Sequence, residues 1–156
     1  MDHRRSTAVF SADQRQAVIG EKYNEKAFDN VKRHIPAYTG EVFEEICKQY
    51  MWRENIADRL PFYFRDAGRW WGTNPLKKCQ QEIDIIAFDD GRAIFCECKW
   101  TKEPVEKDVV DTLIEKSMMF NYKEKHFFVF SKSGFTGECR KNAGSNVRLI
   151  KFEDMV

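Results

Sequence analysis

Long hydrophobic runs are absent from this sequence of 156 residues. Its longer apolar stretches, such as residues 85–88, fall far short of the roughly 18 consecutive apolar residues that indicate a membrane span. The basic residues that follow Met1 precede no apolar stretch of the kind found in a secretory signal. We therefore expect a cytoplasmic protein with no membrane partner.

Patterns typical of several common catalytic and metal sites are also missing. The five cysteines are an odd number and include no Cys-x-x-Cys pair, which argues against a disulfide framework and against a zinc site. No Gly is followed by Lys, so a P-loop is absent, and neither His-Glu-x-x-His nor Gly-x-Ser-x-Gly occurs. The three histidines are too scattered along the chain to suggest histidine-based chemistry.

A surplus of charge of one sign is lacking as well, because 26 Lys and Arg face 25 Asp and Glu, a net charge of +1. A protein that holds polyanions by its net charge alone is excluded, so any contact with nucleic acid has to be a local patch. The sequence does have 42% hydrophobic residues, thirteen Phe among them, which is enough apolar surface for one folded domain.

Pro36 marks an expected boundary between two parts of the chain. Residues 1–36 contain two polar, weakly amphipathic helical stretches, 12–19 and 25–34, and are expected to form an N-terminal helical arm. Residues 37–156 are much richer in core-forming patterns, and we expect them to form the main domain.

The main domain is expected to alternate helices and strands. The pattern predicts a helix over 41–55, a Trp-rich stretch at 68–72, a strand pair at 82–88 and 93–100, a helix over 105–119, a strand at 127–130, a short helix at 137–142 and a last strand at 147–152. The order α, β, β, β, α, β, α, β indicates an α/β fold with a mixed β-sheet core flanked by helices.

The turn Asp90-Gly91 sets the register of the predicted strand pair. With this turn, facing residues place Asp84 opposite Glu97 and Glu82 opposite Lys99, on one face of the hairpin, with facing Cβ atoms about 5 Å apart. Two facing carboxylates repel, so their burial among apolar neighbours requires a positive charge. A divalent cation is one such charge, and carboxylate and backbone oxygens suit Mg²⁺ better than Zn²⁺. The alternative is a cross-strand ion pair between Glu82 and Lys99, with Asp84 and Glu97 pointing to water.

Glu44 is the one acid of the 41–55 helix that is expected to face the sheet. At about 100° per residue it falls only about 20° beyond the arc of apolar residues, whereas Glu41 and Glu45 fall on the solvent side. Taken alone, a Glu at such a boundary is more often a surface residue than a ligand.

These residues together resemble the PD-(D/E)XK nuclease superfamily, whose fold is restriction-endonuclease-like. The resemblance rests on Asp84, on Glu97-Cys98-Lys99 thirteen residues later, and on Glu44 in a preceding helix. The segments around Glu44, residues 69–71, 82–84 and 97–100 are more narrowly similar to the C-terminal domain of unknown function of archaeal-type AAA ATPases. Ile83 replaces the Pro of the superfamily's name, and the ATPase itself is missing from this chain.

The resemblance implies a Mg²⁺- or Mn²⁺-dependent endonuclease acting on DNA. It implies that Asp84 and Glu97 bind the metal, that Glu44 is an additional ligand, that the Cys98 carbonyl contributes, and that Lys99 positions or activates water. An AAA-type ATPase, on a longer chain or as a separate protein, and a second copy of the chain are the implied protein partners. A catalytically silent module that binds DNA or regulates an ATPase, and an enzyme that acts on RNA, remain alternatives.

Two groups of basic residues are candidates for phosphate contacts: Lys77, Lys78 and Lys102 near the ends of the predicted strands, and Lys132, Arg140 and Lys141 within a locally basic segment, residues 132–151. An ordinary solvated surface is an equally good interpretation of the last three. The aromatic residues Trp70, Trp71 and Trp100 are expected mainly in core packing, although such rings also stack on bases.

Overall fold

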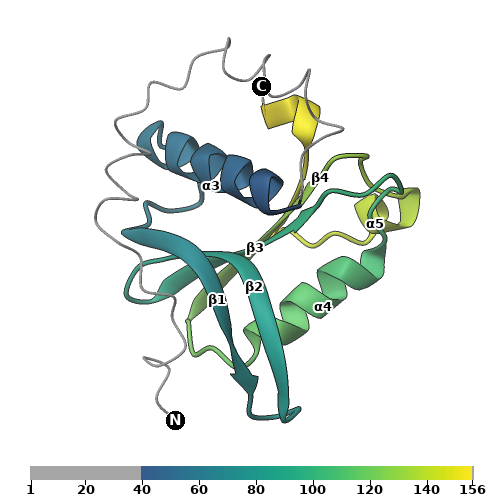
Figure 1. Ribbon diagram of the computed structural model, residues 1–156. Helices are drawn as coiled ribbons and strands as arrows, with labels where there is room; N and C mark the ends of the chain where they lie inside the picture. Colours follow the sequence, from purple (N-terminus) through teal and green to yellow (C-terminus); the bar gives the residue numbers. More distant parts are fainter. Residues whose placement is uncertain (1–39, 156) are drawn as a thin grey trace.

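The computed structural model describes residues 40–155 (Figure 1). The predicted boundary at Pro36, the predicted arm over residues 1–36 and residues 37–39 lie outside the described part. Within it the elements are α3 (Gly40–Ile56), β1 (Asp66–Asn74), β2 (Cys79–Phe88), β3 (Arg92–Lys99), α4 (Lys107–Ser117), β4 (Glu124–Ser131), α5 (Gly137–Lys141), β5 (Val147–Lys151) and the 3-10 helix η3 (Phe152–Met155). The predicted order of elements and the α/β class are confirmed.

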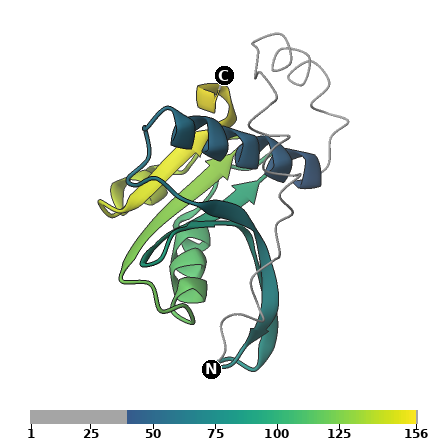
Figure 2. The same cartoon turned by 90° about the vertical axis from the view of Figure 1, so that its left-hand side faces the viewer.

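The five strands form one mixed sheet in the order β1-β2-β3-β4-β5. The pairs β1/β2 and β2/β3 are antiparallel, whereas β3/β4 and β4/β5 are parallel. α3 covers one face of the sheet and α4 covers the other (Figures 1 and 2). Since β3 and β4 run in the same direction, Lys99 and Ser131 meet at one edge of the sheet, and the Lys132 N–H donates to the Lys99 carbonyl at 3.0 Å.

Two hydrophobic cores lie on the two faces of the sheet. The first packs α3 and η3 on the sheet and includes Phe43, Ile85, Cys96 and Phe152. The second lies under α4 and includes Trp70, Ile83, Ile86, Phe95 and Leu113. Alternating residues of β3 enter the two cores in turn, which is the pattern of a strand buried on both faces.

The β2–β3 hairpin has the predicted register, with Ile85 opposite Cys96 and Phe88 opposite Ala93. However, the backbone pairs end at Ile85–Cys96, before Asp84. Between Gly68 and Trp70 the β1–β2 register shifts by one residue, and Ile83 and Ile86 consequently share the second core while Ile85 enters the first. The predicted cross-strand pair of Glu82 and Lys99 is therefore wrong, because a bulge separates the Glu82 end of β2 from the paired ladder.

No helix within residues 40–155 is long and apolar enough to cross a membrane.

Candidate active site

Asp84 lies at the bulge of β2 and is largely buried. Its Oδ2 atom accepts a hydrogen bond of 2.8 Å from the Cys98 backbone N–H. Burial, followed by the negative charge of Glu97, raises the pKa of Asp84 to about 7, and the charges of Glu44 and Glu82 act in the same direction. The bulge thus places a carboxyl group where its ionised form is unfavourable in the absence of a further positive charge.

Glu44 reaches Asp84 from α3. The neighbouring Phe43 is buried in the first core, which turns Glu44 toward the sheet, while Glu41 and Glu45 are exposed as predicted. Burial raises the pKa of Glu44, and a hydrogen bond with Asp84 acts against this rise. Two carboxyl groups can share a hydrogen bond only when one of them carries a proton, so Glu44 and Asp84 behave as a pair.

Glu97 and Lys99 belong to β3 and lie at the same site. The Lys99 Nζ atom is 3.2 Å from Glu97 Oε1. The Glu97 side chain is mostly buried, and its charge acts on both Asp84 and Glu44. The structure therefore brings Glu44, Asp84, Glu97 and Lys99 together from α3, β2 and β3.

Two cationic residues that sequence reasoning missed also belong to the cluster. Arg69 of β1 lies between two acids, with its Nη2 atom 2.6 Å from Glu82 Oε2 and its Nη1 atom 3.6 Å from Glu44 Oε2. Lys116 of α4 lies 4.0 Å from Glu97 Oε2 and donates to the Glu82 carbonyl at 3.0 Å. The helical spacing of Lys116 from the buried Leu113 was a usable signal, because three residues along a helix return to the same face.

The donor atoms of this cluster fit a hard divalent cation. Asp84 and Glu97 supply carboxylate oxygens, and the adjacent Cys98 carbonyl is the main-chain oxygen implied by the resemblance. Mg²⁺ is commonly held by one or two carboxylates and keeps several waters, so it needs no complete protein cage. Within residues 40–155 no group of three or more His, Cys, Asp or Glu side chains is positioned to hold a metal ion, so a metal here would be held by fewer side chains together with main-chain and water oxygens.

The side chain of Cys98 points away from Glu97, as predicted for neighbouring residues of a strand. It packs against the first core and hydrogen bonds with the Cys47 thiol. Burial raises the pKa of both thiols, which keeps them protonated and makes them poor metal ligands. Only the backbone carbonyl of Cys98 is therefore a candidate metal ligand.

The predicted phosphate-contacting residues lie in three places. Lys77 and Lys78 lie in the β1–β2 turn, where Lys77 forms an ion pair with Glu115 of α4. Lys102 and Lys132 follow the ends of β3 and β4, and the Lys132 Nζ atom lies 4.8 Å from the centre of the Trp100 ring. Arg140 and Lys141 are exposed on α5. Of these residues Lys132 is tied directly to the strand end that carries Lys99, because its backbone N–H donates to the Lys99 carbonyl.

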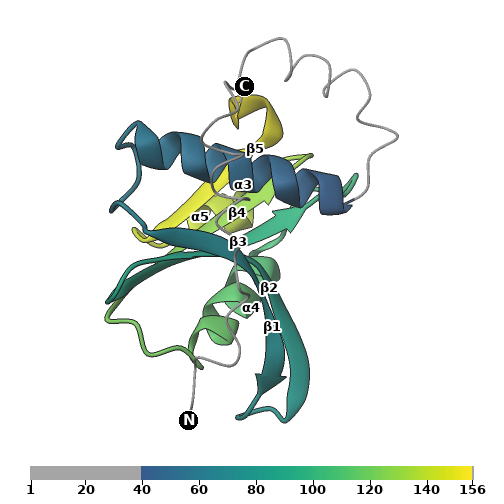
Figure 3. The ribbon, with the colours of Figure 1, turned by 60° about the vertical axis from the view of Figure 1, so that its left-hand side comes forward.

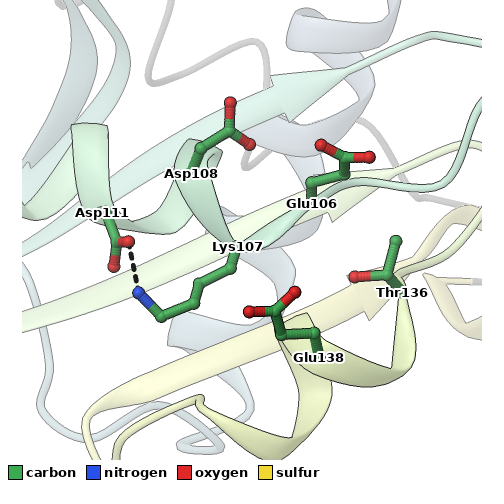
Figure 4. A pocket seen from close by; sticks show the side chains of 6 residues that line it. All are labelled: Glu106, Lys107, Asp108, Asp111, Thr136 and Glu138. Carbon is green, nitrogen blue, oxygen red and sulfur yellow. Dashed lines mark hydrogen bonds and ion pairs between the residues drawn. The ribbon is translucent and has the colours of Figure 1, made fainter.

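A separate hollow of about 380 Å³ lies between the N-terminus of α4 and α5 (Figure 4). Its lining is acidic: Glu106, Asp108, Asp111 and Glu138, with Lys107 and Thr136. Lys107 forms an ion pair with Asp111, with 2.5 Å between Nζ and Oδ2. Because phosphates would be repelled by this lining, the hollow is a poor surface for nucleic acid, and none of the predicted site residues lines it.

Comparisons with known proteins place this site in an uncharacterised family. Residues 11–126 match the model of the DUF234 family, described as archaea bacterial proteins of unknown function. The chain is 32% identical over 120 residues to the uncharacterized protein MJECL04 of Methanocaldococcus jannaschii, which covers 71% of this chain and 26% of that protein. The chain thus spans about a quarter of the length of this relative.

Two solved structures have a distant likeness to the fold. One is the crystal structure of a protein of unknown function, AF1548, with a TM-score of 0.43 and 18% identity over 71% of this chain and 58% of that chain. The other is the DNA modification-dependent restriction endonuclease AspBHI, with a TM-score of 0.38 and 16% identity over 99% of this chain and 38% of that chain. Neither likeness is close enough to assign an activity.

Proposed function

Because the chain belongs to the DUF234 family of archaea bacterial proteins of unknown function, its activity has to be inferred from the site itself, and we propose Mg²⁺-dependent hydrolysis of DNA phosphodiester bonds. One observation carries the proposal: Asp84, Glu44 and Glu97 converge from three elements, and burial together with the repulsion of the neighbouring acids raises the pKa of Asp84 to about 7. Structural ion pairs normally lower the pKa of a carboxyl group, so this cluster is better suited to holding a cation than to stabilising the fold.

Asp84 and Glu97 would hold the metal, with the Cys98 carbonyl, and Glu44 would support Asp84. A bound Mg²⁺ would polarise the scissile phosphate and lower the pKa of a water molecule. Lys99 is held near Glu97 and would offset the negative charge that develops on the phosphate. The Cys98 N–H would fix the orientation of Asp84, since it already occupies one oxygen of that carboxylate.

The proposal is tested by assaying the purified chain with Mg²⁺ or Mn²⁺ on plasmid, single-stranded and branched DNA. We expect metal-dependent cleavage that falls about 100-fold or more in Asp84→Asn and Lys99→Met. Glu44→Gln should also lose activity, whereas Glu45→Gln, the exposed neighbour on the same helix, should not. A parallel assay with RNA decides between the two nucleic acids.

Equal activity in the wild type, Asp84→Asn and Lys99→Met would identify a contaminating nuclease and end the proposal.

A catalytically silent module that binds DNA or regulates an AAA-type ATPase is the second candidate. It is favoured by the cations already present, because Lys99 and Lys116 approach Glu97 while Arg69 approaches Glu44 and Glu82. Calorimetric titration with Mn²⁺ separates the two. A dissociation constant that Asp84→Asn leaves unchanged favours the silent module, and a large loss of affinity favours the nuclease.

A further inference from the structure

The β1–β2 hairpin extends beyond α3 as a long curved arm (Figures 1 and 3). One face of the arm carries Trp70 and Ile83 into the second core. Because neighbouring residues of a strand point to opposite faces, Arg69, Trp71 and Glu82 share the other face, and Trp71 is paired directly with Glu82. We call this second face of the arm the open face.

Trp71 is the exposed aromatic ring of the open face. Its exposed fraction is 60%, against 2% for Trp70, and no ring contact is formed with it by any residue between 40 and 155. Its neighbours on the same face are the charged Arg69 and Glu82, so it is not the edge of a hydrophobic core. Exposing a Trp among charged groups leaves a large apolar surface in water, which favours a site of recognition.

The open face leads directly into the carboxylate cluster. Trp71 and Arg69 are two residues apart, about 7 Å along the strand, and Arg69 contacts both Glu82 and Glu44. Trp71 is also paired with Glu82, which lies two residues before Asp84 in β2, so its ring lies on the part of the strand pair that adjoins the cluster.

The arm is also held in place. The Asn74 Oδ1 atom accepts hydrogen bonds from the backbone N–H groups of Leu76 at 2.9 Å and Lys77 at 3.3 Å, which fixes the turn. The Lys77 side chain pairs with Glu115 and ties the turn to α4 on the side away from the open face. Lys78 follows with its side chain exposed, and it forms no ion pair with a residue of the described chain. The arm thus carries an exposed ring at Trp71, and at its turn a cation, Lys78, that forms no ion pair with a described residue.

We propose that the open face binds an unpaired nucleic-acid strand, with Trp71 stacking on the base next to the phosphate at the carboxylate cluster. This inference rests on the proposed function, from which it takes nucleic acid as the ligand of the open face. It adds the substrate class, which is single-stranded nucleic acid or an unpaired end. A duplex does not fit as well, because its base faces are covered by stacked neighbours and are not accessible to the indole ring. The cationic tip at Lys78 matches a phosphate chain better than it matches a basic peptide.

The test measures binding by fluorescence anisotropy with the full chain in EDTA, so that cleavage plays no part. The probes are a fluorescein-labelled 15-nucleotide oligo(dT) and a labelled DNA duplex of the same length. We expect Trp71→Ala to weaken single-strand binding roughly tenfold and to leave duplex binding unchanged. Trp71→Phe should retain most of the affinity, and Met118→Ala, which removes an exposed apolar side chain directly after α4, should have no effect.

The inference is overturned if Trp71→Ala binds both probes like the wild type, if both probes are weakened equally, or if the wild type does not bind the single strand. Sedimentation of the wild type and Trp71→Ala tests the other occupant, since a dimer that Trp71→Ala dissociates would make the open face an interface between copies. Failure of the proposed function looks different: the wild type would bind the single strand through Trp71 without cleaving DNA. Normal single-strand preference in Trp71→Ala, with cleavage abolished in Asp84→Asn, would overturn this inference alone.

Discussion

At the scale of the residue, Asp84 is a carboxyl group that costs the metal-free protein stability. Its pKa in the folded protein is about 7, whereas an unfolded chain gives a value near 4. At low pH both states are protonated and the burial of Asp84 carries no ionisation cost. As the pH rises from about 4 to 7 the unfolded state loses its proton first, so stability falls, and above pH 7 the full cost remains.

We therefore expect Asp84→Asn to stabilise the protein in EDTA, because the amide keeps an oxygen acceptor for the Cys98 N–H without the charge. The gain in the free energy of unfolding should be about 4 kcal/mol at pH 8 and about a third of that at pH 5. Urea denaturation at the two pH values measures it. Asp154→Asn, at an exposed position of η3, is the control and should change neither value. A loss of stability that is equal at both pH values would contradict the assigned charge cost.

The residues of the cluster differ in how far sequence could identify them. Asp84, Glu97 and Lys99 form a short local pattern, and Glu44 follows from helix periodicity, so four members could be named in advance. Arg69 and Lys116 could not be assigned to the cluster, because their roles depend on β1 and α4 packing beside β2 and β3. The spacing of Lys116 from Leu113 indicates which face of α4 it lies on, but not that this face meets Glu97.

At the scale of the element, α4 brings one cation to the carboxylate cluster. The Lys116 side chain is only 17% exposed, and it lies between Glu97 and the backbone of Glu82. If the site hydrolyses DNA, Lys116 supports Glu97 and adds positive charge near the phosphate. We expect Lys116→Met to lower kcat about tenfold or more with little change in KM. Steady-state cleavage assays measure both, and Lys123→Met, at an exposed position after α4, serves as the control.

A drop in thermal stability with an unchanged kcat would instead show that Lys116 acts only as a tie between α4 and β2.

The elements themselves were largely predictable, since both long helices and the strands from β2 onward follow clear periodicities. The bulge was not. It arises where β1 and β2 shift register beside Trp70. The alternation of apolar and polar residues in β2 and β3 does not reveal how β1 pairs with β2, so it could not predict the bulge. As a result the predicted register of the hairpin is correct up to Ile85, and the predicted partner of Glu82 is wrong.

At the scale of the whole molecule, the C-terminal segment closes the first core over the site. Phe152 is 5% exposed and packs its ring against Phe43 and Trp100, with centroid distances of 6.0 Å and 5.6 Å. These two partners directly adjoin Glu44 and Lys99 in sequence. Two aromatic contacts of Phe152 thus support the residues next to Glu44 and Lys99, from positions more than fifty residues away along the chain.

Phe152→Ala should therefore weaken the fold and the site together. Removing a buried Phe side chain leaves a cavity, and we expect the free energy of unfolding to fall by about 3 kcal/mol or more. Urea denaturation measures this loss, and calorimetry with Mn²⁺ at low temperature, where the variant remains folded, should show weaker binding as Glu44 and Lys99 lose their support. Glu153→Ala is the matched control, because Glu153 is exposed and its 3.7 Å pair with Lys151 lies at the surface, where such pairs contribute little. If Phe152→Ala lost stability but bound Mn²⁺ as tightly as the wild type, the aromatic contact would serve the fold alone, and Glu44 would have to be held by its contacts with Arg69 and Asp84.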